Sequence, residues 1–160
     1  MTAFTEQIDA EAEYLLERGK PMPSKNHSRL ESRLARILGN NYEETYDTFV
    51  ELSLELTTGK ATPDLCLFKP EPSDWLEDEI RVKNAPLGVI EIVSPKQSTQ
   101  DLVDKLDLYF GAGVLSCWIV IPTFKMINVF HAKYDYKTFM SGELFDEKLG
   151  VRLILEEVFK

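Results

Sequence analysis

The sequence predicts a mixed α/β fold in which a central β-sheet is flanked by helices. Two segments of helical periodicity come first, and several short apolar segments of strand length follow them. A helical segment also separates two fully apolar segments, which is the pattern of a strand–helix–strand crossover through residues 87–121. At 160 residues the chain is long enough for one hydrophobic core, so we expect a single domain over residues 1–160.

Two helices are expected before the first strand. Residues 5–18 (TEQIDAEAEYLLER) form the first helical pattern. Residues 23–40 predict the second helix, with Ser24 or Asn26 as its N-terminal cap and Gly39–Asn40 at its end. The apolar stripe of this second helix consists of Leu30, Leu34, Ile37 and Leu38.

The next segments predict strands and a long loop. Residues 48–56 (TFVELSLEL) alternate strictly between apolar and polar side chains, which predicts one half-buried strand with a wet face. A turn at Gly59 leads to a second expected strand over residues 61–68. Residues 71–86 are polar and acidic, so we expect a solvated loop there.

The crossover begins with residues 87–95 (LGVIEIVSP), which read as a strand buried on both faces. Residues 97–113 predict the crossover helix, because Ser98 and Asp101 match a capping box at its start. Two further strands are expected at residues 116–122 and 125–132, and a hairpin at residues 134–144 continues the sheet.

Composition restricts the function classes. The net charge of −9 and the pI near 4.8 count against tight, non-specific duplex binding, and no arginine-rich stripe is evident. A local basic patch or bound divalent cations can still reverse the field at one site. Cys66 and Cys117 lack the spacing of a zinc site and are expected to be buried free thiols. His27 and His131 are far apart in the sequence and form no ligand motif.

The expected location is the cytosol. No apolar run approaches the roughly 20 residues needed to span a bilayer, so no membrane partner is expected. The N-terminal segment is acidic and helical, unlike a secretory signal or a transit peptide.

Glu91 is the most informative residue, because it lies in the middle of the apolar segment LGVIEIVSP. An ionised carboxylate in a dry interior costs several kcal/mol unless a metal ion or a lysine shares its site. A simpler reading places Glu91 near a sheet end, in solvent or paired with Arg81 or Lys83. We favour a functional role, since a charge embedded in such a strand is unusual.

Asp64 and Lys105 are the other two candidates. Asp64 follows Pro63 at the start of an apolar strand, and Lys105 lies on the helix after Glu91. Two carboxylates from neighbouring strands form the oxygen-rich site that Mg²⁺ prefers, and a lysine beside them can orient water for phosphodiester hydrolysis. Plainer readings exist: Pro-Asp is a common turn, and Asp101 can cap its helix or pair with Lys105 in solvent.

Together these segments resemble the Uma-two family, whose members are classed as endonucleases of the PD-(D/E)XK, or restriction-endonuclease-like, superfamily. The resemblance rests on Pro63–Asp64, PLGVIEIVSP (residues 86–95), QDLVDKLDLYFGAGV (100–114) and CWIVIP (117–122). Residues 19–30 and 153–159 extend it over nearly the whole chain. It implies a restriction-endonuclease-like core.

The resemblance also implies a metal site. Asp64, Glu91 and the main-chain carbonyl of Ile92 correspond to ligands of Mg²⁺ or Mn²⁺. The superfamily's lysine normally lies two residues after the second carboxylate, where this chain has Val93. The resemblance therefore assigns the catalytic lysine to Lys105 on the following helix. The accessory positions that it implies are His27, Glu31, Asp101 and Tyr109, although surface positions for His27 and Glu31 are the simpler reading of the residues alone.

The implied activity is metal-dependent hydrolysis of DNA phosphodiester bonds. Cutting two strands favours two sites, so we expect a homodimer. Two alternatives stay open. The chain is a nuclease-fold module that binds or assembles without catalysis, which its acidic balance favours, or it is a nuclease that acts on RNA or on a small phosphodiester.

Overall fold

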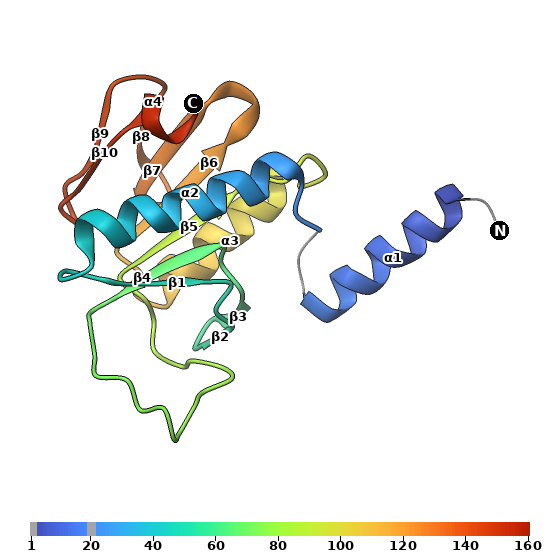
Figure 1. The fold of residues 1–160 in the computed structure, drawn as a ribbon, viewed down its shortest axis with the longest axis horizontal. Helices are drawn as coiled ribbons and strands as arrows, with labels where there is room; N and C mark the ends of the chain where they lie inside the picture. Colours follow the sequence, from blue (N-terminus) through green and yellow to red (C-terminus); the bar gives the residue numbers. More distant parts are fainter. Residues whose placement is uncertain (1–2, 19–21) are drawn as a thin grey trace.

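A six-stranded mixed sheet forms the centre of the molecule (Figure 1). The structure is a computed structural model that describes residues 3–18 and 22–160. In spatial order the strands are β1 (Asp47–Val50), β4 (Leu65–Phe68), β5 (Gly88–Ile92), β6 (Ser116–Ile121), β7 (Met126–Ala132) and β8 (Asp135–Phe139). Neighbouring strands are antiparallel except β5 and β6, which pair in parallel.

Two smaller sheets and several helices complete the described chain. The smaller sheets are antiparallel pairs: β2 (Leu54–Leu56) with β3 (Gly59–Ala61), and β9 (Glu143–Asp146) with β10 (Val151–Ile154). The helices are α1 (Ala3–Arg18), α2 (Lys25–Tyr42), α3 (Thr99–Gly111), the 3₁₀ turn η1 (Pro122–Phe124) and α4 (Leu155–Val158). None of the helices in the described ranges is long and apolar enough to cross a membrane.

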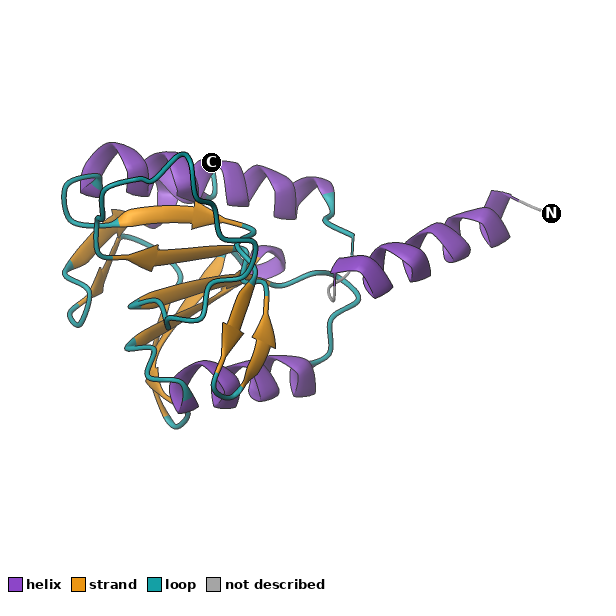
Figure 2. Ribbon diagram, turned by 90° about the horizontal axis from the view of Figure 1, so that it is seen from below, coloured by secondary structure: helices purple, strands orange, loops and turns teal. Residues whose placement is uncertain are grey.

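Helices α2 and α3 cover opposite faces of the central sheet, whereas α1 extends away from it (Figure 2). The core on the α2 face contains Leu34 and Leu38 together with Ile90 of β5. The core on the α3 face contains Leu106 together with Val89 of β5. Because side chains alternate along a strand, β5 contributes to both cores, and all five of its residues are buried. The predicted fold class is therefore confirmed.

The crossover agrees with the sequence prediction. Strand β5 leads through α3 to β6, its parallel neighbour. The predicted capping box is present: the Ser98 hydroxyl accepts from the Asp101 N–H at 3.2 Å, and the Asp101 carboxylate accepts from the Ser98 N–H at 3.4 Å. Cys66 and Cys117 are buried free thiols, as predicted.

Three predicted element boundaries were wrong. Helix α2 continues past Gly39–Asn40 to Tyr42, whose hydroxyl accepts from the Arg152 N–H at 2.7 Å and so ties the helix end to β10. The hairpin expected at residues 134–144 is divided, because β8 extends the central sheet while β9 pairs with β10. The strand expected at residues 61–68 starts only at Leu65.

The alternating segment at residues 48–56 was also predicted wrongly as one strand. Glu51 has a φ of 56°, in the left-handed region that interrupts a strand. Its N–H donates to the Asp64 carbonyl at 3.1 Å, and the chain divides there into β1 and β2, which pair with different strands. Leu54 and Leu56 are buried as the pattern predicts, but Val50 is exposed.

Candidate active site

Glu91 lies in β5 on the face that packs against α3. Strand alternation places its side chain on the same face as Val89, which belongs to the α3-side core. Only 2% of Glu91 is exposed. A carboxylate buried to this degree needs partners that replace water, and α3 supplies them.

Two side chains of α3 bind the two oxygens of Glu91. The Lys105 ammonium donates to Oε2 at 2.9 Å, and the Tyr109 hydroxyl donates to Oε1 at 2.5 Å. Residues four apart lie on one face of a helix, so α3 presents both donors to β5 at once. Arg81 and Lys83, the alternative partners considered for Glu91, are exposed and do not contact it.

The charge of Glu91 depends on these partners. Burial raises the pKa of Glu91, the Lys105 ammonium lowers it, and the nearby Asp64 carboxylate raises it again. The hydrogen bond from Tyr109 also favours the ionised form of Glu91. Conversely, burial and the neighbouring Glu91 carboxylate hold the pKa of Tyr109 well above its ordinary value, so Tyr109 acts as a hydrogen-bond donor.

Asp64 lies between β3 and β4, directly before the first residue of β4. Its side chain is 1% exposed. Oδ2 accepts from the Ile92 N–H at 2.7 Å, and Oδ1 lies 3.1 Å from Nε2 of His27. Asp64 therefore joins the end of β5 to helix α2, so although the chain bends at this Pro-Asp, its carboxylate is buried and does more than form a turn.

His27 and Glu31, one turn apart on α2, complete a second group of polar side chains at this end of the sheet. One ligand atom from each of His27, Glu31 and Asp64 lies within 4.8 Å of the other two. In the described ranges, this is the one group of three metal-ligating side chains found at such spacing. Nδ1 of His27 is buried without a hydrogen-bond partner in the described structure. A nitrogen and carboxylate oxygens are suitable donors for a divalent cation, so these residues fit the metal that the fold class implies.

His27 and Glu31 do not lie on the surface, which was the simpler expectation for both residues. His27 is buried, and Glu31 is partly buried. Glu91, expected as a ligand beside Asp64, is not a member of the group of three. The main-chain N–H of Ile92, whose carbonyl was expected to bind the metal, donates a hydrogen bond to Asp64.

The two other expected residues lie on α3. Asp101 caps this helix, and Lys105 forms an ion pair with Glu91.

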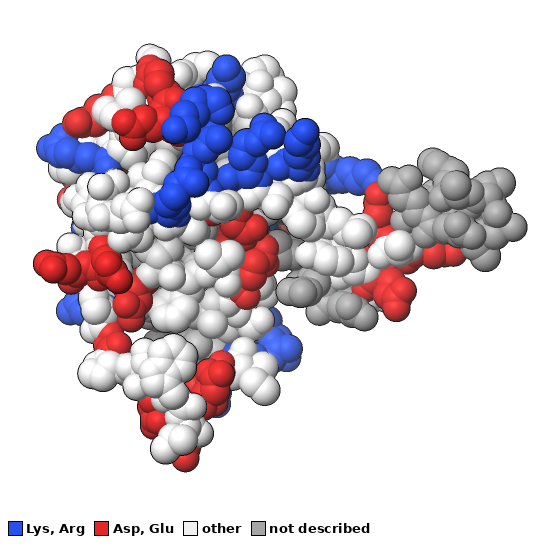
Figure 3. Space-filling model, viewed as in Figure 1, with Lys and Arg blue, Asp and Glu red and all other residues white. Residues whose placement is uncertain are grey.

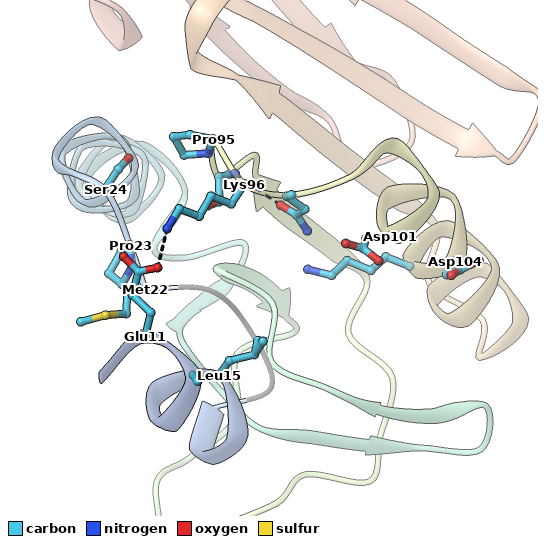
Figure 4. A pocket seen from close by; sticks show the side chains of 13 residues that line it. Glu11, Leu15, Met22, Pro23, Ser24, Pro95, Lys96, Asp101 and Asp104 are labelled. Atoms are coloured by element: carbon cyan, nitrogen blue, oxygen red, sulfur yellow. Dashed lines mark hydrogen bonds and ion pairs between the residues drawn. The ribbon is translucent and has the colours of Figure 1, made fainter. Parts of the chain in front are cut away.

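A pocket of about 900 Å³ opens beside α3 (Figure 4). Lys105, the partner of Glu91, is one of the residues that line it. Its walls come from α1, from the segment before α2, from the loop after β5 and from α3. Glu11 of α1 forms an ion pair with Lys96 of that loop across the pocket. Because Lys105 is 26% exposed, its side chain connects the pocket to the buried Glu91 carboxylate.

A third buried carboxylate, Asp146, was missed by the sequence analysis. It accepts hydrogen bonds from Ser116 and Trp118 of β6 and lies 2.9 Å from Nε2 of His131. Burial raises the pKa of Asp146, but these hydrogen bonds lower it by more, so the net shift is downward. Ser116 begins β6, whereas Ile92 ends the parallel strand β5. Asp146 thus fastens β9 to the opposite end of the sheet and serves the fold.

The family model Uma2, described as "Putative restriction endonuclease", matches residues 11–159 of the chain. The chain belongs to the Uma2 family. Its family supports a nuclease function, and the predicted resemblance is confirmed. No curated protein matches the sequence significantly.

A solved structure has the same fold as this Uma2 chain. It is the crystal structure of a putative nuclease belonging to DUF820 from Anabaena variabilis ATCC 29413, with a TM-score of 0.76 and 21% sequence identity. The match covers 88% of this chain and 83% of that chain. At this identity the likeness establishes the fold. In this Uma2 chain Val93 is the residue two positions after Glu91, and Lys105 of α3 provides an ammonium group at Glu91.

Proposed function

We propose that this Uma2 chain is a metal-dependent endonuclease that hydrolyses DNA phosphodiester bonds. The observation that carries the proposal is the buried Glu91 carboxylate, held by Lys105 and Tyr109 of α3. Lys105 and Tyr109 bind Glu91 from the α3 face, and Asp64, which accepts from the Ile92 N–H next to Glu91, forms a group with His27 and Glu31 of α2. Such a convergence of ionisable groups is expensive for stability and is typical of catalytic sites.

The residues that would hold a divalent metal are Asp64, with His27 and Glu31, and Glu91 with the Ile92 carbonyl. A bound Mg²⁺ or Mn²⁺ supplies Lewis-acid stabilisation of the scissile phosphate and lowers the pKa of a bound water. His27 orients Asp64 through its contact with Oδ1, and the Ile92 N–H fixes Oδ2.

Lys105 has two roles in this proposal. Its ammonium lowers the pKa of Glu91 and so favours the ionised carboxylate, and from its partly exposed position at the pocket it stabilises negative charge on a phosphate that enters. Tyr109 fixes Oε1 of Glu91, which leaves Oε2 to Lys105. Attack by water on the phosphorus breaks the P–O bond directly, and the leaving oxygen takes up a proton, so no covalent enzyme intermediate is needed.

Plasmid nicking in Mg²⁺ or Mn²⁺ tests the assignment. We expect activity in the unaltered protein and a loss of roughly 100-fold or more in Asp64→Asn, Glu91→Gln and Lys105→Met. The matched controls are Asp74→Asn in the exposed loop and Lys60→Met on β3, which should retain activity. Nicking that survives all three site substitutions would refute the assignment.

Calorimetric titration with Mn²⁺ separates the alternatives. Binding that is weakened by His27→Ala and by Asp64→Asn supports the metal site. Absence of both binding and nicking would favour a nuclease-fold module without catalysis, and cleavage of RNA alone would identify RNA rather than DNA as the substrate.

Since cutting both strands favours two sites, we also expect a homodimer, which light scattering can measure.

A further inference from the structure

The outer surface of α2 carries a line of basic side chains. They occupy positions i, i+4, i+8 and i+11 and therefore lie on one face of the helix. We call this set the α2 basic stripe, and it consists of Lys25, Arg29, Arg33 and Arg36. Figure 3 shows Lys and Arg gathered over α2, between surfaces that are largely uncharged or acidic. The expectation that the sequence contains no arginine-rich stripe was wrong.

Of these four side chains, only one makes close hydrogen bonds to the residues that the structure describes. Arg33 donates to the main-chain carbonyls of Val158 at 2.7 Å and Lys160 at 3.0 Å, so it anchors the C-terminal segment to α2. Arg29 has a long contact of 3.4 Å with the side chain of Asn26, which is neutral. Among the residues that the structure describes, no member of the α2 basic stripe forms an ion pair with an Asp or Glu side chain.

This arrangement does not stabilise the helix. The N-terminus of a helix is its positive end, and cations there are unfavourable. Helix α2 has no acidic residue in its first turn, and its own first residue is Lys25. Like charges four residues apart, as at Lys25 and Arg29, repel by a further few tenths of a kcal/mol per pair. In a chain with a net charge of −9, the exposed cations of Lys25, Arg29 and Arg36, which form no ion pair among the described residues, are suited to an external polyanion.

The position of the stripe points to the kind of polyanion. The first turns of α2 carry both the start of the stripe and the site residues His27 and Glu31. Lys25 and Arg36 are about 17 Å apart along the axis, at 1.5 Å per residue, which corresponds to about five base-pair steps of 3.4 Å. A guanidinium group also matches phosphate oxygens in two directions at once.

We propose that the α2 basic stripe binds the sugar–phosphate backbone of DNA and guides the strand to the site at the N-terminal end of α2. The inference rests on the proposed endonuclease function, because that function makes DNA the polyanion that must reach His27 and Asp64. The stripe gives an acidic protein a local basic surface of the kind required for phosphate contacts. It carries no base recognition, so the binding it provides is independent of sequence.

The test measures binding separately from cleavage. Fluorescence anisotropy of a labelled DNA duplex in EDTA reports binding in the absence of catalytic metal. We expect Arg29→Glu/Arg36→Glu to weaken binding roughly 10- to 100-fold and to reduce the slope of log K against log salt by about two. Arg29→Gln/Arg36→Gln should give a smaller loss in the same direction. Arg33 is left intact because it anchors the C-terminal segment.

Lys60→Glu/Lys69→Glu is the matched control, because it changes the net charge by the same amount at exposed positions outside α2. Circular dichroism and thermal melting verify that each variant is folded. The proposal is overturned if the control loses as much affinity as the stripe variants, if the stripe variants bind normally, or if the unaltered protein does not bind the duplex. Loss of binding to phosphatidylserine vesicles with unchanged DNA binding would assign the stripe to a lipid surface and overturn it too.

Binding and nicking fail independently. A stripe variant that nicks DNA with unchanged affinity refutes the stripe and leaves the endonuclease intact. A protein that binds DNA through α2 but nicks nothing in Mg²⁺ or Mn²⁺ refutes the proposed catalysis and leaves the stripe intact.

Discussion

Lys105→Met removes the one cation among the described residues that contacts the buried Glu91 carboxylate. The ammonium lies 2.9 Å from Oε2 of Glu91, and methionine keeps most of the aliphatic side chain. Removal of one partner from a fully buried ion pair costs about 3–5 kcal/mol, because the remaining charge is left uncompensated. Since Lys105 is 26% exposed, water already screens part of this interaction. We therefore expect a loss of about 2–3 kcal/mol in the free energy of unfolding near neutral pH.

The pH dependence of this loss identifies its cause. Burial raises the pKa of Glu91 above its ordinary 4.5, and the Lys105 ammonium counteracts this effect. Without Lys105, the pKa of Glu91 in the folded state rises further. A carboxyl group with a raised folded-state pKa favours the fold fully below its unfolded pKa, and that contribution is lost as pH rises through the folded-state pKa. The cost of Lys105→Met should therefore be small near pH 4.5 and grow with pH.

Urea denaturation in EDTA over a series of pH values provides the measurement. At neutral pH the loss corresponds to a fall in Tm of roughly 4–12 °C. Lys60→Met, an exposed control, should change stability by less than about 0.5 kcal/mol. Adding Glu91→Gln to Lys105→Met should remove most of the pH dependence. A cost for Lys105→Met that is the same at every pH would refute the idea that the buried charge is its source.

Two further predictions concern buried groups away from the proposed chemistry. Asp146→Asn should lower the free energy of unfolding by about 2–4 kcal/mol, because it weakens a buried set of hydrogen bonds. The pKa of Asp146 lies below its ordinary 3.8, so its contribution is present above that value and is lost as pH falls through the folded-state pKa. Urea titrations at neutral and acidic pH measure both effects, and equal stability of the two proteins would contradict the assigned role. Burial raises the pKa of Cys66 to about 12 and that of Cys117 well above 9, so neither thiol should react with a disulfide reagent until the protein unfolds. Rapid labelling of the native protein would disprove this.

The central part of the fold was predictable because its signals are local. Every residue of β5 except Glu91 is apolar. A capping box then starts the next helix within a few residues. A crossover helix must pack back onto the sheet it leaves, so a partner for Glu91 from α3 was a reasonable expectation. Lys105 was a candidate because of its place on this helix, and the family resemblance favoured it over the solvated pair with Asp101 that helical spacing equally allowed.

Other features depend on contacts between distant residues, which periodicity does not encode. The alternation at residues 48–56 was correct for β2, but the left-handed Glu51 is fixed by a hydrogen bond to the Asp64 carbonyl. The extension of α2 through Gly39 is supported by the bond between Tyr42 and β10.

The buried polar pairs were not predicted for the same reason, because they also depend on contacts between distant residues. His27 and Asp64 belong to different elements, and so do His131 and Asp146. Each pair forms only when the elements pack, so a search for ligand spacing along the chain did not detect it. The α2 basic stripe is different, because its positions lie within one helix. It was missed because net charge was weighed over the whole chain rather than along each helical face.

The hydrogen bond from the Ile92 N–H to Asp64 makes one backbone signal a spectroscopic reporter. A proton donated to a carboxylate shifts in its NMR frequency when that carboxylate gains a proton or a cation, because the bond is charge-assisted. Ile92 is only 2% exposed, so solvent has little direct effect on its amide. A cation that engages Asp64 should move this signal, whereas one attracted to the exposed acidic loop should leave it in place. Ion binding at the site can thus be followed through a single amide without labelling a side chain.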